Sequence, residues 1–176
     1  MVGRFPWKAS MRVTLRTQAY YRKVAEDALD KAGVSEPPVP VGKIVEALGI
    51  PVVPVNLPVF FTAATINTDG LPVMVVNFAQ PEAVRREAVS HMLSHMLLLL
   101  DDPSNTMPRD ATDHADAEAL SHELTMPATM VIEQSRLWFN DFRYLARLFG
   151  VGEAAMLERM RELGIVTHQQ GVRWDY

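Results

Sequence analysis

The spacing of apolar positions predicts two helices and then three strands in the first half of the chain. These five segments are residues 15–32, 41–48, 51–55, 59–66 and 73–77. In the first segment apolar side chains recur at helical spacing, whereas the three strand segments are short and rich in β-branched residues. Gly33 and Gly49 follow the two helices, and the sequence Asn67-Thr68-Asp69-Gly70 supplies a turn before the third strand.

The second half of the chain has helical spacing almost throughout. Pro81 is expected to be the first residue of a long helix that runs to about Leu100. Residues 101–112 are polar, contain two prolines and are expected to form a loop, after which Asp113 would cap a helix reaching about Met126. The remaining predicted segments are a helix that opens at Pro127, helices over residues 141–149 and 153–163, and a strand after Gly164.

This order of elements predicts an α+β fold, in which a small early sheet is followed and surrounded by helices. No linker long enough to separate domains interrupts the pattern. The 176 residues are therefore expected to form a single domain with a sizeable core.

Composition narrows the classes of protein that are possible. The chain has no cysteine, which excludes disulfides, thiolate metal sites and a cysteine nucleophile. Its formal net charge of −4 argues against a strongly basic nucleic-acid binder. The N-terminus does not resemble a signal peptide, and the apolar run at residues 96–100 is far shorter than the roughly 20 residues of a membrane-spanning helix. We therefore expect a soluble, cytoplasmic protein.

Three of the five histidines are placed to bind one metal ion. His91 and His95 stand four residues apart in the predicted long helix, so their imidazoles share one face. This is the spacing of the ligand pair in zinc-peptidase helices of the H-E-x-x-H type. A catalytic zinc site needs a third protein ligand. His114 is the candidate, because it begins the next helix on the stripe of residues that looks buried.

The competing interpretation of this pattern is structural. An arbitrary pair of histidines at this spacing is more often buried in a core than bound to a metal, and His122 and His168 lie away from the predicted site. The acidic residues in the following helix, among them Asp116 and Glu123, are typical of a solvated helix face. Met92, which follows the first histidine, is most simply a core side chain, because methionine fills irregular gaps.

Several segments of the chain, in the same order, resemble the ImmA/IrrE family of zinc metallopeptidases. The resemblance spans about residues 18–166. It rests on VPVGKIVEALGI at 39–50, VVN at 75–77, the Arg85-Arg86 pair with the His-x-x-x-His helix, HADAEALSHELTMP at 114–127 and VGEAAMLERMRELGI at 151–165. The second zinc helix of the family reads E-x-x-A-D/N-x-F-A-x-x-L-L-M-P, and Ala117 and Met126-Pro127 match it.

The resemblance implies a zincin-like core over residues 1–126 and a helical C-terminal subdomain over residues 127–176. It also implies one zinc ion, held by His91, His95 and His114. In the family these helices carry the metal ligands and the groove beside the sheet edge takes the polypeptide substrate.

The chain departs from the family pattern at three positions. Met92 stands where the family has its glutamate general base, and Ser94 stands where it usually has glycine. His114 replaces a glutamate ligand, which would convert a site of two histidines and one glutamate into a site of three histidines. Histidine is also a good zinc ligand, so this last change indicates compensation rather than decay.

Three functions follow from these departures. The preferred hypothesis is a zinc-binding pseudo-peptidase that binds a protein partner, which the resemblance implies could be a helix-turn-helix repressor in a phage or stress-response switch. The second is an active hydrolase in which Asp113 or Glu118 replaces the missing base. The third is a DNA-binding regulator that uses the C-terminal helices, although the acidic balance of the chain argues against it.

Overall fold

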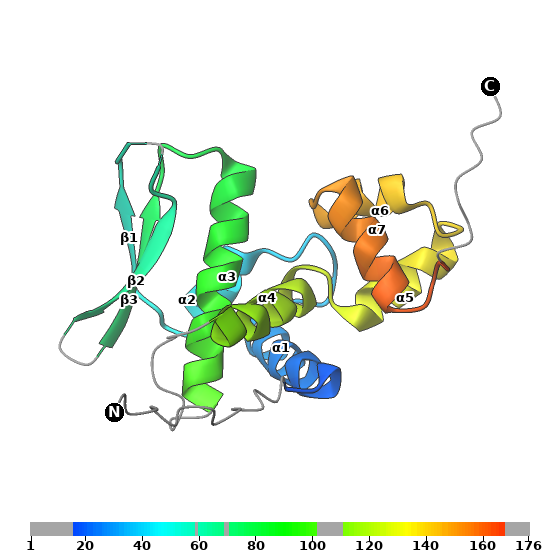
Figure 1. Ribbon diagram of the computed structural model, residues 1–176, viewed down its shortest axis with the longest axis horizontal. Coiled ribbons are helices and arrows are strands. Elements are labelled where there is room, and N and C mark those ends of the chain that lie inside the picture. Colours follow the sequence, from blue (N-terminus) through cyan, green and yellow to red (C-terminus); the bar gives the residue numbers. More distant parts are fainter. Residues whose placement is uncertain (1–15, 59, 69–70, 102–110, 168–176) are drawn as a thin grey trace, which may run out of the picture.

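A computed structural model of the chain describes residues 16–58, 60–68, 71–101 and 111–167 (Figure 1). Within these residues it contains seven helices and three strands. They are α1 (Gln18–Ala32), α2 (Val41–Ala47), β1 (Val52–Val55), β2 (Ala63–Thr68), β3 (Leu71–Asn77), α3 (Glu82–Asp101), α4 (Ala111–Thr125), α5 (Ala128–Leu137), α6 (Phe142–Phe149) and α7 (Glu153–Glu162). The early small sheet and the later helices confirm the predicted α+β fold.

The three strands form a mixed sheet in the order β1-β3-β2. β1 runs parallel to β3, with Val53 opposite Val75, and β2 runs antiparallel to β3, with Thr65 opposite Met74. Met74 and Val76 are buried, because the face of β3 that carries them is covered by α3. β2 therefore lies at an edge of the described sheet and beside the long helix.

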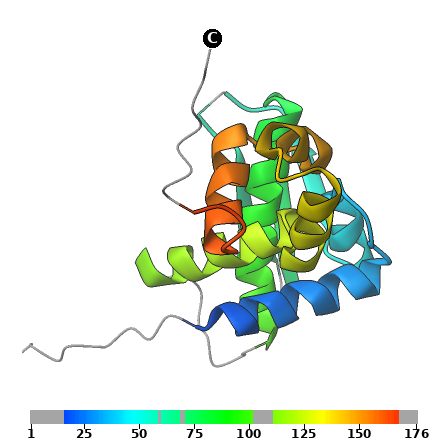
Figure 2. The ribbon, with the colours of Figure 1, turned by 90° about the vertical axis from the view of Figure 1, so that its right-hand side faces the viewer.

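The long helix α3 lies between the sheet and helices α4 to α7 (Figure 1). α4 crosses α3 and also packs on α1, so α3 has the sheet on one side and α4 on the other. Figure 2 shows that α5, α6 and α7 also lie on the side of α3 away from the sheet. No helix among the described residues combines the length and apolarity that crossing a membrane requires.

The buried apolar side chains form two clusters. The first joins α1, α2, β3, α3 and α4 and includes Ile44, Met74, Leu93 and Leu124. The second joins α5, α6 and α7 and begins at Met126. The boundary between the clusters thus falls at the end of α4. This lies close to the division between residues 126 and 127 that the family resemblance implies.

Two arginines connect the elements across that boundary. Arg159 of α7 forms a buried ion pair of 2.6 Å with Glu123 of α4, and its Nε donates to the carbonyl of Met126. Arg86 of α3 donates to the carbonyls of Phe149 and Gly150 at the end of α6. Gly150 has a φ of 64°, and an added Cβ would lie 2.6 Å from the Arg86 guanidinium. Only glycine fits this contact without a shift of that side chain.

Several predicted boundaries were wrong. α3 begins at Glu82, because Pro81 lies outside the helix and its carbonyl accepts the first helical hydrogen bond, from Arg85. α4 begins at Ala111, so Asp113 lies inside the first turn and is not the residue before the helix. Local sequence signals locate helix ends only to within one or two residues.

Two strand predictions were also wrong. β2 begins at Ala63 instead of residue 59, because a turn closed by Phe61 N–H donating to the Pro58 carbonyl delays the strand. Residues 164–167 form a turn and a bend rather than a strand. The end of the predicted tail strand and the start of the predicted first helix lie outside the described residues.

Candidate metal centre

Small polar side chains line the crossing of α3 and α4. Ser90 and Ser94 are completely buried there, and Ser121 Oγ on α4 donates to Ser90 Oγ on α3 at 2.8 Å. Ser94 Oγ donates to the Ser90 carbonyl one turn earlier in the same helix. Ser94 occupies the position at which the family usually has glycine. Its side chain is small, and its hydroxyl has a hydrogen-bond partner within the same helix. The two helix backbones can therefore approach closely enough for side chains of α4 to reach those of α3.

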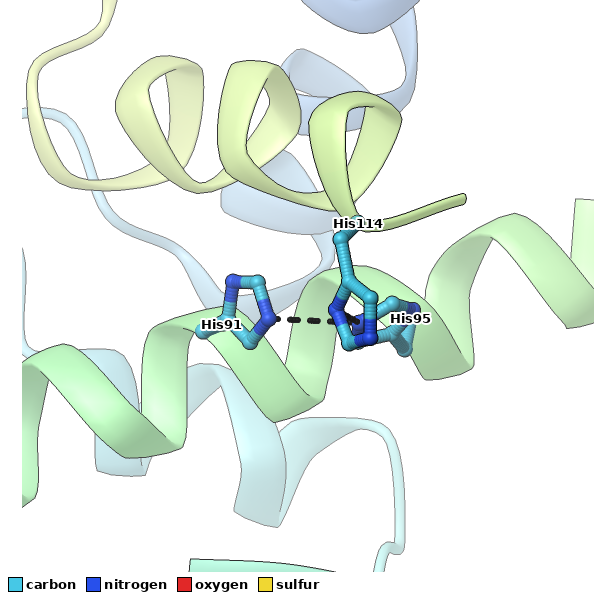
Figure 3. Close-up of side chains that lie close together, drawn as sticks. All are labelled: His91, His95 and His114. Carbon is cyan, nitrogen blue, oxygen red and sulfur yellow. Dashed lines mark hydrogen bonds between the residues drawn. The ribbon is translucent and has the colours of Figure 1, made fainter. Parts of the chain in front are cut away.

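Three histidine rings converge beside this crossing (Figure 3). His95 Nε2 lies 3.2 Å from His91 Nε2 and 3.3 Å from His114 Nδ1. The candidate ligand atoms of all three rings lie within 4.8 Å of one another. His95 is buried, His91 is half-buried and His114 is exposed, so the cluster opens to solvent on the side of α4. The predicted convergence of the three histidines is confirmed.

The donor set fits a tetrahedral metal ion. Two nitrogens that each lie ~2.0–2.1 Å from a tetrahedral zinc ion are about 3.3 Å apart. The distances from His95 to His91 and to His114, 3.2 Å and 3.3 Å, match this spacing, whereas the ligand atoms of the three rings together span up to 4.8 Å. In a neutral imidazole a ring nitrogen either donates one proton or offers one lone pair in the ring plane. His95 Nε2 therefore cannot form good hydrogen bonds to both neighbours, whereas three lone pairs directed at one cation would all be used.

Electrostatics favours the neutral form of the first ligand. The pKa of His91 is lowered, first because burial penalises the charged ring and second because His114 lies nearby. The carboxylates of Glu118 and Glu87 act in the opposite direction on this pKa. A metal ligand must be the neutral imidazole, so the environment prepares His91 for that role near neutral pH.

The side chain at the general-base position is directed toward the sheet. The hydroxyl of Thr65, on the edge strand β2, donates to the Met92 sulfur at 3.8 Å. Met92 is partly buried and packs against the first apolar cluster, as its interpretation as a core residue predicted. A thioether accepts only weak hydrogen bonds and does not take up a proton at neutral pH.

Two carboxylates of α4 differ from their prediction. Asp116 is buried and accepts a hydrogen bond of 2.6 Å from the Tyr21 hydroxyl, which links α4 to α1. Glu123 is also buried, in the ion pair with Arg159. Both were expected on a solvated face. For Asp116, the helical spacing of Tyr21 with the buried residues of α1 could have indicated this contact. A buried tyrosine hydroxyl usually has a hydrogen-bond partner.

The other sequence candidates stand apart from the cluster or cannot be placed. His122 is half-buried on α4 and does not belong to the group of converging ligand atoms. Glu118 is exposed on α4, one turn beyond His114. The side chain of Asp113 and the whole of His168 lie outside the described residues.

The fold and the histidine geometry thus define the class of protein. It is a metallopeptidase-type fold, in which a pair of helices lies beside a small sheet. The family model described as IrrE N-terminal-like domain matches residues 45–161. This chain belongs to that family, the ImmA/IrrE metallopeptidases. A comparison with curated proteins gave no match.

A Mycobacterium tuberculosis transcriptional regulator is among the solved structures that share the fold, with a TM-score of 0.60 and 18% sequence identity over 81% of this chain. The match covers 46% of the regulator, so this chain spans less than half of that protein's length. At this identity the likeness establishes the fold alone.

Proposed function

We propose that this protein binds one zinc ion through His91, His95 and His114 and holds a protein partner without hydrolysing it. The observation that carries the proposal is the side chain at position 92. The family geometry places a general base there, and this chain places a thioether that contacts Thr65. The proposal therefore separates the two tasks of a peptidase, which are holding a polypeptide and transferring protons.

Support for the metal comes from the donor set. Three imidazoles from two helices match the three protein ligands that catalytic zinc sites use, with a fourth position left open. Zinc, when bound, would polarise a carbonyl and make a water molecule more acidic. Zinc is favoured over magnesium or calcium, because the described cluster offers nitrogen and no carboxylate ligand.

The expected loss of hydrolysis follows from the missing proton acceptor. In a zinc peptidase a glutamate takes a proton from water and later passes it to the leaving amine. Positioned general acid–base catalysis is typically worth ~10²–10⁴-fold in rate. With Met92 at that position, cleavage of a peptide bond should be slower by about that factor than in a relative with glutamate.

The partner would bind along the edge strand. Among the described residues, no strand pairs with the outer side of β2. Thr65 of β2 contacts Met92 of α3, the residue that follows His91, so this edge lies next to the metal helix. An extended segment can add to such an edge through main-chain hydrogen bonds, which need no catalytic base. The family supports a helix-turn-helix repressor as the source of this segment, and the fold shared with a transcriptional regulator is compatible with a regulatory role.

The test compares binding and cleavage in the same sample. Zinc-loaded protein is incubated with a helix-turn-helix repressor from the same genome, and binding is measured by calorimetry while cleavage is followed by mass spectrometry. We expect a complex and no cleavage. Chelator-sensitive cleavage by the unmodified protein would overturn the proposal.

Two variants at one position sharpen the result. Met92→Glu introduces the base. Met92→Gln introduces a side chain of the same shape as glutamate that cannot act as a base. Cleavage gained by the first variant and absent from the second would show that only the proton acceptor was missing. Equal behaviour of the two would show that more than the proton acceptor separates this site from an active one.

One observation favours a second candidate, an active hydrolase with a displaced base. The Glu118 carboxylate is exposed on α4 and lies close enough to His91 to raise the pKa of that ring against the effect of burial. Cleavage by the unmodified protein that disappears in Glu118→Gln, with zinc content unchanged, would establish this alternative.

A further inference from the structure

An apolar pocket lies between α2, the sheet and the first turns of α3, and none of the three histidines lines it. Its volume is about 830 Å³. Val45 of α2, Val52 of β1 and Val89 of α3 contribute to its walls. This volume lies within the range of ~300–1,000 Å³ that is usual for small-molecule sites. The pocket is therefore large enough for a ligand of moderate size and too apolar for a fully polar one.

Arg85 and Arg86 line the same pocket. Arg85 Nη1 donates to the carbonyls of Phe78 and Gln80, and its guanidinium stacks on the Phe78 ring at 4.8 Å. Its Nε and Nη2 groups donate to no described residue. Arg85 is thus held in position by neutral groups while part of its donor fork remains available.

Arg86 adds a second positive charge that neutral groups hold. Its nitrogens donate to the carbonyls of Val39, Phe149 and Gly150. Burial lowers the pKa of this guanidinium, and the nearby Glu82 partly opposes that effect. Within the described residues, neither Arg85 nor Arg86 forms an ion pair with a carboxylate. Glu82 also lines the pocket, so two arginines and one carboxylate leave a net positive charge there, which an anion would neutralise.

We propose that this pocket binds a small apolar molecule that ends in a carboxylate, such as a medium-chain fatty acid. The hydrocarbon chain would lie against the valine side chains, and the carboxylate would accept hydrogen bonds from the free donors of Arg85. A guanidinium matches a carboxylate with two parallel hydrogen bonds, which gives selectivity for this head group. The site is separate from the histidine cluster, so the inference does not depend on metal binding.

Calorimetric titration of the full chain with decanoate and with decanol tests the head group. Saturable one-to-one binding of decanoate is expected, with decanol weaker by about tenfold or more, because an alcohol cannot form the paired charge-assisted hydrogen bonds that a carboxylate forms with a guanidinium. Arg85→Gln should remove this preference and leave decanol binding unchanged. Equal affinities for decanoate and decanol in the unmodified protein, or no saturable binding, would overturn the proposal.

A matched pair of substitutions tests the location. Ala83 lines the pocket and Ala154 does not, yet each is exposed and is the second residue of its helix, α3 or α7. Ala83→Trp should block decanoate binding, whereas Ala154→Trp should leave it intact. Thermal unfolding verifies that both variants fold. Retained binding in a folded Ala83→Trp variant would show that the ligand occupies another surface and would contradict the proposal.

Discussion

His95 on α3 and His114 on α4 bring two ring nitrogens to within 3.3 Å of each other across 19 residues of sequence. His95 also lies 3.2 Å from His91, one helical turn away. The helix alone sets the second distance, since residues four apart share a face. The first distance depends on how α3 and α4 cross, and so on the serines buried between them.

Removal of His114 should abolish tight metal binding. We expect His114→Ala to lower the zinc affinity by more than about 100-fold, because even the loss of an outer partner of a metal ligand costs ~10–100-fold. Competition with a chromophoric chelator measures the affinity. His122→Ala, on the same helix but outside the cluster, is the control and should bind as the unmodified protein does. Unchanged affinity in His114→Ala would remove this residue from the ligand set.

The buried Tyr21–Asp116 hydrogen bond should make the free energy of unfolding decrease as pH rises into the alkaline range. The pKa of Tyr21 is raised, first by burial and then by its hydrogen bond and charge interaction with Asp116. A raised pKa means that this contribution is complete below about pH 10, where the unfolded phenol is neutral. It is lost as pH rises further, because the unfolded chain releases the proton first.

Tyr21→Phe tests this dependence. At neutral pH the variant should lose about 1–3 kcal/mol in the free energy of unfolding, because the buried Asp116 carboxylate loses its donor. Between pH 9 and 11 its stability should fall less steeply than that of the unmodified protein. Tyr20→Phe is the control, since the Tyr20 hydroxyl donates to Asp101 at an exposed site. Urea unfolding at several pH values measures all three proteins, and parallel pH curves would refute the assignment.

The Glu123–Arg159 ion pair should matter most when only one partner is removed. Both side chains are almost completely buried, and Glu123 also accepts a hydrogen bond from the Ala128 N–H at the start of α5. Arg159→Met leaves a buried charge without its partner and should cost ~3–5 kcal/mol of stability. The double variant Glu123→Leu with Arg159→Met should recover most of that loss, since apolar packing can replace a buried pair.

A surface ion pair supplies the contrast for this measurement. Lys23 and Asp27 are 2.9 Å apart, and their side chains are 74% and 66% exposed. Asp27→Asn should cost no more than about 0.5 kcal/mol, as is usual for helix pairs four residues apart. If Arg159→Met costs as little as Asp27→Asn in denaturant unfolding, the buried pair does not hold α7 to α4.

Asn77 should hold the loop between β1 and β2. Its Nδ2 donates to the carbonyls of Leu57 and Phe61, and its Oδ1 accepts from the N–H of Leu57. Asn77→Ala should lower stability by about 1–3 kcal/mol, because partly buried backbone groups lose their hydrogen-bond partners. It should also speed amide hydrogen exchange at Leu57 and Phe61. Asn56→Ala, an exposed position in the same loop, is the control. Similar exchange rates in the two variants would contradict this role.

The local pattern of the sequence predicted the order of the helices and of the three strands, though not all of their ends, and part of the site. Helical spacing placed His91 and His95 on one face, and β-branched runs located the three strands, because both are properties of neighbouring residues. The departure at Met92 was also visible in the sequence, since it occupies one position in a short motif. The family resemblance, confirmed by the match to residues 45–161, supplied the relation between the two metal helices.

The tertiary structure alone decided which distant side chains meet. The order β1-β3-β2, the Ser90–Ser121 contact and the burial of Asp116 against Tyr21 all join residues far apart in the chain. Periodicity describes only the face of an element, and a polar residue on that face can be solvated or paired. Asp116 and Glu123 are buried because α1 and α7 bring a phenol and a guanidinium to them. Tyr21 and Arg159 come into contact with these carboxylates only once the helices have packed.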